Sequence, residues 1–219
     1  RKHFETPLGT FPPATETIDR IAAAYGTDRA FGEEILHRSE HSLELQLPLL
    51  AHRYAGALPE IVPILVGSFH HHLETRTSPR AGGEIDDFIG ILASTLRELR
   101  DAGQQVLLYG GVDLAHVGKF FGDTERMSDT QLPSIEYRDR QLLEAIFSGD
   151  GEALFEHMAE DTDRRRICGF PSIYTMLHAL ADAGQPVRGE LLEYHQAVDP
   201  TSDCTVTFAT AYWSPSAVR

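Results

Sequence analysis

Hydrophobic residues recur at helical spacing through much of the chain. In "EIDDFIGILASTLRELRDAG" (84–103) they form one stripe that Gly103 closes, which predicts a helix. Similar spacing predicts helices over 134–147 and 151–159, and over 172–184 with Pro171 in the first turn. A further helix over 15–25 is predicted with Thr15 as its cap and Gly26 as its stop.

The segment "HRSEHSLELQLPLLAHRY" (37–54) fits two patterns. Its leucines alternate from 43 to 49, which is the period of a half-buried strand. Leu43, Leu47 and Leu50 also fall at i, i+4 and i+7, which is one stripe of a helix. Ser39 could cap that helix, whereas Pro48 weakens either reading because it removes a backbone donor. The pattern alone leaves both structures open.

Four segments are predicted to be strands. "EIVPILVGSF" (60–69) indicates a short buried strand, with Pro63 favouring an edge or a bulge. "QVLLYGGV" (105–112) is apolar on both faces, as in the middle of a covered sheet. Residues 187–197 and 203–213 alternate around "DPTS" and should pair antiparallel. We therefore expect an α/β fold: one three-layer domain with a mixed sheet covered by helices and a C-terminal antiparallel hairpin.

Length, charge and cysteine content narrow the class of protein. The 219 residues are enough for one sizeable domain. A net charge of −14 disfavours nucleic acid and anionic membranes as partners, and no apolar run approaches the length of a membrane span. Two cysteines make no disulfide framework, so we expect a reducing, cytoplasmic location.

"GGVDLAHVGKFFGD" (110–123) is the first candidate for chemistry. Gly110 and Gly111 follow the predicted buried strand, and ligands of α/β sheets collect beyond such strand ends. Asp113 could orient His116 and hold it ready as an acid, base or ligand. The alternative is that Asp113 caps a turn and His116 is a packed loop residue, because this spacing arises often by chance.

Cys168 is the second candidate. It precedes a predicted helix and follows three arginines, 164–166, and both features favour the thiolate that binds metals or reacts. The alternative is a small buried apolar residue, which is also the reading we favour for Cys204 in a strand facing a core. The histidines at 70–72 are expected in a solvated loop, because adjacent residues rarely converge on one ion. His178 and His195 are interpreted as structural.

Five segments in this order resemble the MEMO-like family, which in bacteria and archaea is component B of the AmmeMemoRadiSam system. They are "SEHSLELQLPLL", "EIVPILVGSF", "GGVDLAHVGKFFGD", "RRICGFPSIYTMLHAL" and the closing hairpin. The resemblance implies that the Glu-His-Ser segment begins a helix, so we predict a helix there. It also implies a fold like that of class III extradiol dioxygenases, which use non-haem iron.

The resemblance also assigns roles to the candidate residues. Cys168 takes the place of the dioxygenases' carboxylate metal ligand, and His116 that of their acid/base, with Asp113 beside it. We expect these three in one pocket, with Glu40, His41, Gly110 and Gly111 at its wall.

The sequence departs from the family at its N-terminal side. The Pro-His-Ala-Gly and Ser-His-His segments, where the family's first metal-site histidines lie, are not present between residues 1 and 219. We therefore expect an N-terminally incomplete MEMO-like domain, a fragment or a natural short form, that binds copper or iron weakly or not at all, although the full-length protein would bind it. By resemblance, its partners would be an unknown small molecule and radical SAM and AMMECR1-like proteins.

These residues are consistent with three functions. The first is a metal-dependent redox protein with a dioxygenase-like pocket and an unknown substrate. The second is a non-catalytic binding or adaptor module with a vestigial metal site. The third, hydrolysis by a Cys168–His116 pair, requires the two side chains within hydrogen-bond reach. Whether the chain is an enzyme stays open at this point.

Overall fold

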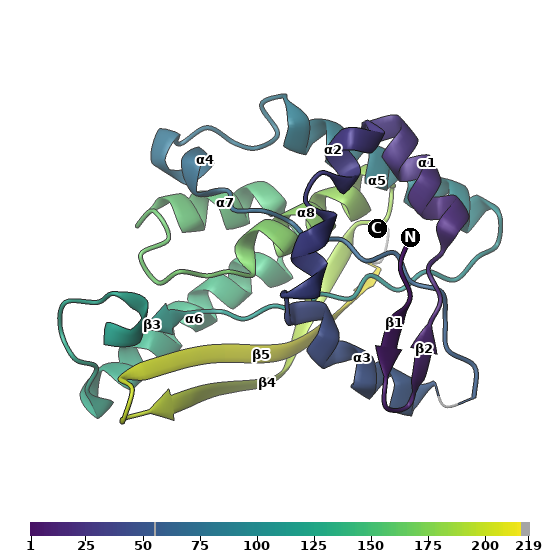
Figure 1. Ribbon diagram of the computed structural model, residues 1–219. Coiled ribbons are helices and arrows are strands. Elements are labelled where there is room, and N and C mark those ends of the chain that lie inside the picture. The colour runs from purple at the N-terminus through teal and green to yellow at the C-terminus, as the bar shows by residue number, and fades with distance from the viewer. Residues whose placement is uncertain (55, 216–219) are drawn as a thin grey trace. The chain divides into compact units, whose positions relative to one another are not determined.

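A computed structural model describes residues 1–54 and 56–215 (Figure 1). The chain divides into two compact units, the first made of Arg1–Val66 with Glu98–Gly111 and the second of Gly67–Arg97 with Val112–Arg219. The expectation of a single domain therefore stays a prediction. Among the described residues, no helix combines the length and apolar character that crossing a bilayer requires.

The first unit has a small core between a β-hairpin and one helix. Its elements are β1 (Phe4–Thr6), β2 (Gly9–Phe11), α1 (Thr15–Tyr25), α2 (Thr27–Phe31), the 3₁₀ helix η1 (Glu34–Arg38) and α3 (Ser42–Arg53). Strands β1 and β2 pair antiparallel, and α3 lies against β1 (Figure 1). Phe11, Leu47 and Ala51 are the buried centre of this core. The hairpin is not among the elements predicted from the sequence, because three-residue strands carry too short a pattern.

Helix α3 settles the ambiguity of segment 37–54 and confirms the helix. Leu47 is buried, whereas Leu45 and Leu49 are 63% and 66% exposed, so only the helical stripe faces the core. Ser39 does not cap the helix, because α3 begins only at Ser42. The Glu40 carboxylate instead accepts the Ser42 N–H at 2.8 Å.

Two predicted strands are wrong. Between 60 and 69 the described pairing is one isolated parallel bridge, Pro13 to Ile61. Segment 105–112 is not a strand, and Leu107 is 67% exposed rather than buried at the centre of a sheet. A strand needs a hydrogen-bonded neighbour, and within the part of the chain that the structure describes no ladder forms along this segment.

The second unit contains the longer elements. They are α4 (His70–Thr75), α5 (Glu84–Asp101, whose last four residues belong to the first unit), β3 (His116–Val117), the 3₁₀ helices η2 (Lys119–Phe121) and η3 (Asp129–Gln131), α6 (Leu132–Phe147), α7 (Gly151–Ala159), α8 (Phe170–Asp182), β4 (Val187–Asp199) and β5 (Cys204–Pro215). The strand order is β3-β5-β4, and both pairings are antiparallel.

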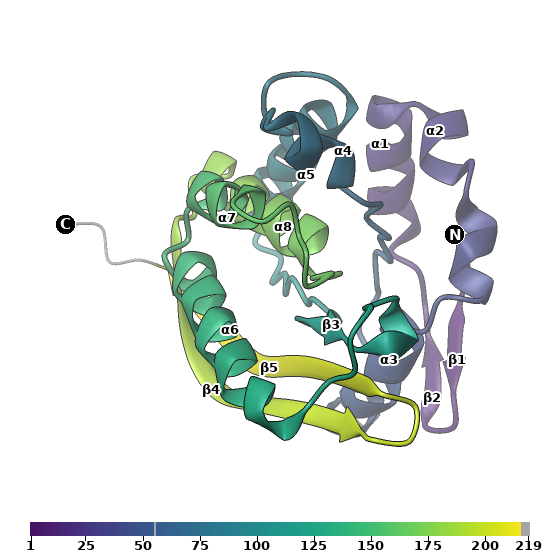
Figure 2. The ribbon, with the colours of Figure 1, turned by 90° about the vertical axis from the view of Figure 1, so that its left-hand side faces the viewer.

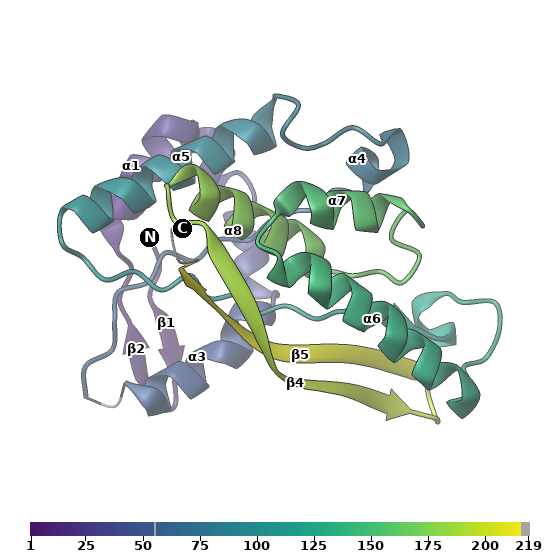
Figure 3. The same cartoon turned by 180° about the vertical axis from the view of Figure 1, so that it is seen from behind.

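The C-terminal hairpin is confirmed and forms one wall of this unit. Glu190 pairs with Tyr212 and Val198 with Thr205, with one bulge beside Leu191. Helix α6 runs along the hairpin and packs on β4, while α7 packs between α6 and α8 (Figures 2 and 3). The combination of helices and small sheets agrees with the α/β class. The sheet is antiparallel, however, where a mixed one was expected, because the two predicted strands at 60–69 and 105–112 do not join it.

The predicted helices of this unit are confirmed, with shifts of a few residues at their ends. Helix α8 begins at Phe170 with Pro171 in its first turn, and α6 begins two residues earlier than expected. Asp150 caps α7, since its carboxylate accepts the N–H groups of the helix's second and third residues. In the first unit, Thr15 is the first residue of α1 and makes no cap hydrogen bond, so that cap was wrong.

Candidate functional site

Asp113, His116 and Cys168 meet in the second unit. A carboxylate oxygen, an imidazole nitrogen and the thiol sulfur, one from each residue, all lie within 4.8 Å of one another. His116 is in β3, Asp113 lies in the segment before it, and Cys168 comes two residues before the start of α8. Cys168, more than 50 positions along the chain from the other two, thus presents its sulfur beside their donor atoms.

Gly169 brings Cys168 to this point. The Gly169 N–H donates to the Asp113 carbonyl oxygen at 3.2 Å, and a Cβ at Gly169 would lie only 2.7 Å from that same oxygen. No larger residue fits without moving one of the two segments. The Cys168 sulfur consequently lies 3.9 Å from the Asp113 carbonyl oxygen, and the residue is exposed.

Backbone carbonyls fix the orientation of the His116 ring. Its Nδ1 lies 3.0 Å from the Arg166 carbonyl oxygen and 3.1 Å from that of Leu114. A carbonyl can only accept, so Nδ1 carries the hydrogen and donates. In the neutral ring, Nε2 therefore presents its lone pair on the side of Asp113 and Cys168.

Asp113 does not orient His116, contrary to the expectation from their spacing. Its nearest carboxylate oxygen is 3.8 Å from His116 Nε2, which is too long for a hydrogen bond. The carboxylate is about half exposed and lies on the side of Nε2, while the ring is held by the two carbonyls at Nδ1 and by edge-to-face packing on the Phe121 ring. Asp113 is thus placed as a third donor group rather than as a support for the imidazole.

Two of the three arginines before Cys168 bind carboxylates. The Arg165 guanidinium is buried against Asp139, and the Arg166 guanidinium donates to Asp123 at 2.8 Å. Their charges are therefore neutralised by partners other than the thiol. The expectation that they favour a Cys168 thiolate has no support from these contacts.

The other predicted pocket residues belong to the first unit. Gly111 packs on α3, since a Cβ there would lie 2.7 Å from the Ser42 carbonyl oxygen. The Ser42 N–H lowers the pKa of the Glu40 carboxyl, and His41 is exposed. The place of Glu40, His41, Gly110 and Gly111 at the wall of a pocket stays a prediction.

The other histidines of the second unit that the sequence analysis singled out are not among the three residues of the cluster. The predicted loop at 70–72 is wrong, since these residues form the first turn of α4, where successive side chains point in different directions. Burial lowers the pKa of His178, which lies in α8 with its ring 4.3 Å from that of Tyr174. His195, in β4, lies beside the Phe208 ring. These packing contacts agree with the structural interpretation of the last two.

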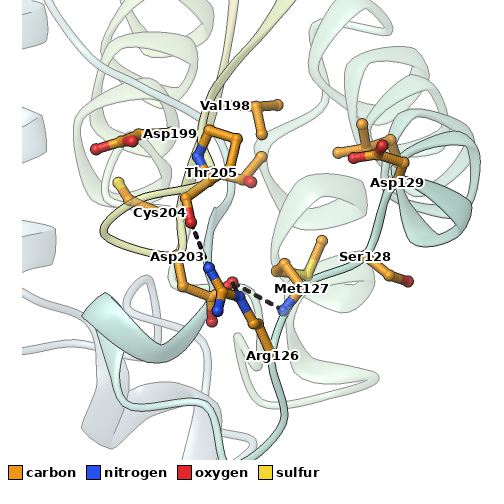
Figure 4. A pocket seen from close by; sticks show the side chains of 11 residues that line it. Arg126, Met127, Ser128, Asp129, Val198, Asp199, Asp203, Cys204 and Thr205 are labelled. Carbon is orange, nitrogen blue, oxygen red and sulfur yellow. Dashed lines mark hydrogen bonds and ion pairs between the residues drawn. The ribbon is translucent and has the colours of Figure 1, made fainter.

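A pocket at the β4–β5 turn holds the second cysteine (Figure 4). Asp203 accepts the Met127 N–H there at 3.0 Å, and Arg126 reaches the turn from the loop before α6. Cys204 is partly exposed rather than in the core as expected. Burial and the nearby Asp199 raise the pKa of its thiol, which keeps it protonated. None of the residues that line this pocket belongs to the Asp113–His116–Cys168 cluster.

The residues that hold His116 in place are not among the candidates that the sequence indicated. Arg166 contacts both its ring and its carbonyl, and Asp123 holds the Arg166 guanidinium. Asp123 is the last residue of the "GGVDLAHVGKFFGD" segment, so its place in the same motif as His116 could have indicated it as a candidate. Only the fold shows that it meets Arg166, which is 43 residues away.

Comparison with known proteins identifies the family. The family described as Memo-like protein matches residues 1–212. A MEMO1 family protein of Aquifex aeolicus is 23% identical over 94% of this chain and 48% of its own length. Those of Thermus thermophilus and Schizosaccharomyces pombe are 29% and 28% identical, over 87% and 94% of this chain and 50% and 69% of theirs. The chain thus spans about half to two thirds of the length of most of the curated relatives it matches, and by the match over residues 1–212 it belongs to the Memo-like protein family.

Proposed function

We propose that the Asp113–His116–Cys168 cluster is part of a metal-dependent redox site that acts on a small molecule. One observation carries the proposal: three donor groups of different chemistry converge within 4.8 Å from separate segments. The resemblance of the family to class III extradiol dioxygenases supports the reaction class. The substrate is left at the level of a small molecule.

The donor set suits copper or iron. The Cys168 thiolate is a ligand for transition metals, whereas calcium and magnesium require oxygen ligands. Bonds of about 2.0 to 2.3 Å around a tetrahedral ion place ligand atoms about 3.5 Å apart. The Cys168 sulfur and an Asp113 oxygen lie within 4.8 Å of each other, so they would approach by at most about 1.3 Å on binding, which side-chain rotation can provide. A bound copper or iron ion would supply electron transfer and Lewis acidity at this point.

Each side chain has a proposed role. Cys168 is the soft ligand, because its sulfur is exposed beside the other two groups. His116 accepts or returns a proton at Nε2, since its Nδ1 hydrogen is already committed to the backbone. Asp113 supplies a carboxylate oxygen as a further ligand or as a partner for the protonated ring. Remaining coordination positions would be filled by water, by substrate or by residues outside this chain.

Metal titration of the 219-residue chain tests the proposal. Co²⁺ is a suitable probe, because thiolate ligation gives it a ligand-to-metal charge-transfer absorption, and Cu⁺ affinity can be measured against a chelator. We expect weak saturable binding with that absorption. Cys168→Ser should abolish the band and weaken binding at least about tenfold, since it removes the soft ligand.

Cys204→Ser is the matched control, because Cys204 lies in the pocket at the β4–β5 turn, and it should leave the band unchanged. His116→Ala should leave affinity within a few-fold, as expected for proton transfer rather than ligation. Equal effects of the two cysteine substitutions would refute the site. If the chain shows no Cys168-dependent binding, the alternative of a non-catalytic binding module becomes the better description.

A further inference from the structure

Arg166 contacts His116 through both its backbone and its side chain. The Arg166 carbonyl oxygen accepts the His116 Nδ1 hydrogen at 3.0 Å, and the guanidinium Nη1 donates to the His116 carbonyl oxygen at 3.1 Å. The neighbouring Arg165 carbonyl accepts the His116 N–H at 2.7 Å. Ring, N–H and carbonyl of one histidine are thus all bonded to two successive residues.

Arg166 holds this geometry in an unfavourable backbone conformation. Its φ is +54°, a left-handed value that a residue with a side chain rarely adopts. Such a conformation persists only where surrounding contacts fix it. Here the left-handed turn of the backbone aims the Arg166 carbonyl at His116, so the side-chain contacts that fix Arg166 also fix the acceptor for Nδ1.

Asp123 completes the arrangement from the other side. It accepts the Arg166 Nη2 hydrogen at 2.8 Å with one carboxylate oxygen and the Gly118 N–H at 2.7 Å with the other. Gly118 itself has φ +112° and packs so closely on the Asp203 carbonyl that no Cβ fits. The carboxylate is therefore bonded at both oxygens and joins the loop after β3 to the loop before α8.

We infer that Arg166 and Asp123 form a positioning pair that keeps the hydrogen of the neutral His116 ring on Nδ1 and leaves Nε2 free to face Asp113 and Cys168. This inference rests on the proposed function, in which Nε2 is the working nitrogen. The pair acts through the backbone and touches neither substrate nor metal. Together with the Leu114 carbonyl, which also accepts at Nδ1, it leaves Nε2 as the available nitrogen of His116.

The tautomer of His116 can be measured without any metal. Imidazole ¹⁵N chemical shifts of the full chain, recorded with the ring neutral, distinguish Nδ1–H from Nε2–H. We expect the wild type to be predominantly Nδ1–H. Arg166→Ala should lower the ratio of Nδ1–H to Nε2–H by about fivefold, which is the factor that one net hydrogen bond contributes. Arg164→Ala, an exposed arginine of the same basic run, is the matched control and should leave the ratio unchanged.

Two conservative variants keep the test decisive if Arg166→Ala does not fold. Arg166→Lys retains the charge but cannot bridge Asp123 and the His116 carbonyl, and Asp123→Asn retains the size of the carboxylate. Both should shift the ratio in the same direction but less far. The inference is overturned if every folded variant of Arg166 and Asp123 keeps the wild-type ratio of Nδ1–H to Nε2–H. It is also overturned if Arg164→Ala shifts that ratio as far as Arg166→Ala does. Either result refutes the positioning pair. The metal site is judged separately, by the Cys168 titration.

Discussion

A buried ion pair anchors the loop that carries Cys168, and its removal should be measurable as a large loss of stability. Asp139, on α6, is fully buried and binds the Arg165 guanidinium, whose side chain is 10% exposed. The Tyr194 hydroxyl donates to the other Asp139 oxygen at 2.9 Å. Because the Arg165 carbonyl also accepts the His116 N–H, the pair connects α6, β4 and the candidate site.

The expected cost follows from the burial of both charges. Asp139→Asn keeps the size of the side chain but leaves a buried guanidinium without a counter-charge, which costs about 3–5 kcal/mol. That is a fifth or more of the free energy of unfolding of a typical domain, about 5–15 kcal/mol. Burial raises the pKa of Asp139, although the Thr207 hydrogen bond and the Arg165 charge both lower it. Desolvation of the carboxylate therefore offsets much of the attraction between the two charges. The double variant with Arg165→Met should therefore lose less than the sum of the single variants, by about 2 kcal/mol.

The chain provides its own probe for this measurement. Its single tryptophan, Trp213 on β5, has its ring 5.9 Å from that of Phe147 at the end of α6. Urea unfolding followed by Trp213 fluorescence thus reports on the hairpin and on the helix that carries Asp139. Glu136→Gln breaks an exposed pair with Arg140 on the same helix and should cost less than about 1 kcal/mol. A loss below about 1 kcal/mol for Asp139→Asn, or strict additivity in the double variant, would refute the reasoning.

Two further predictions concern the close contact of Gly169 with Asp113 and the loss of folding stability at low pH. Gly169→Ala should displace Cys168, because the alanine Cβ would lie 2.7 Å from the Asp113 carbonyl oxygen. We expect the folded variant to lose the Co²⁺ charge-transfer band, and an unaltered band would contradict this. Burial alone would raise the pKa of Asp123, but the Gly118 N–H and the Arg166 guanidinium hold it below its ordinary value of 3.8. Asp123 therefore stabilises the fold fully above about pH 4, and this contribution is lost as the pH falls through the depressed pKa. Asp123→Asn should flatten the acid limb of a stability-against-pH curve, and an unchanged limb would contradict it.

Local patterns predicted the elements that local interactions determine. Helix α5 carries an apolar stripe of six residues, and Gly103, with φ +76°, follows its end. The alternation in 187–197 and 203–213 corresponds to a hairpin whose inward residues, such as Thr205 and Thr207, are buried. Spacing sufficed in these cases because each element, or each pair of neighbouring strands, satisfies its own backbone hydrogen bonds.

The apolar segment 105–112 shows where such patterns stop being sufficient. Its sequence indicates a strand covered on both faces, yet Val106 and Tyr109 are about half exposed. Whether an apolar run becomes a strand depends on distant segments that provide its ladder, and no local pattern contains them. The same limit applies to the site. The spacing of Asp113 and His116 indicated a candidate, but it could not show that carbonyls, rather than Asp113, orient the ring.

The surroundings of Cys168 exclude its interpretation as a small buried apolar residue. A small apolar core residue would be buried, whereas Cys168 is exposed between two constrained neighbours. Ile167 is 2% exposed, and its N–H donates to the Asp163 carboxylate at 2.6 Å. Gly169 is held against the Asp113 carbonyl oxygen at a distance that excludes a side chain. Burial fixes Ile167 and close backbone contact fixes Gly169, so the backbone of Cys168 between them has little conformational freedom. The sulfur is therefore held at the surface beside His116 rather than buried in the core.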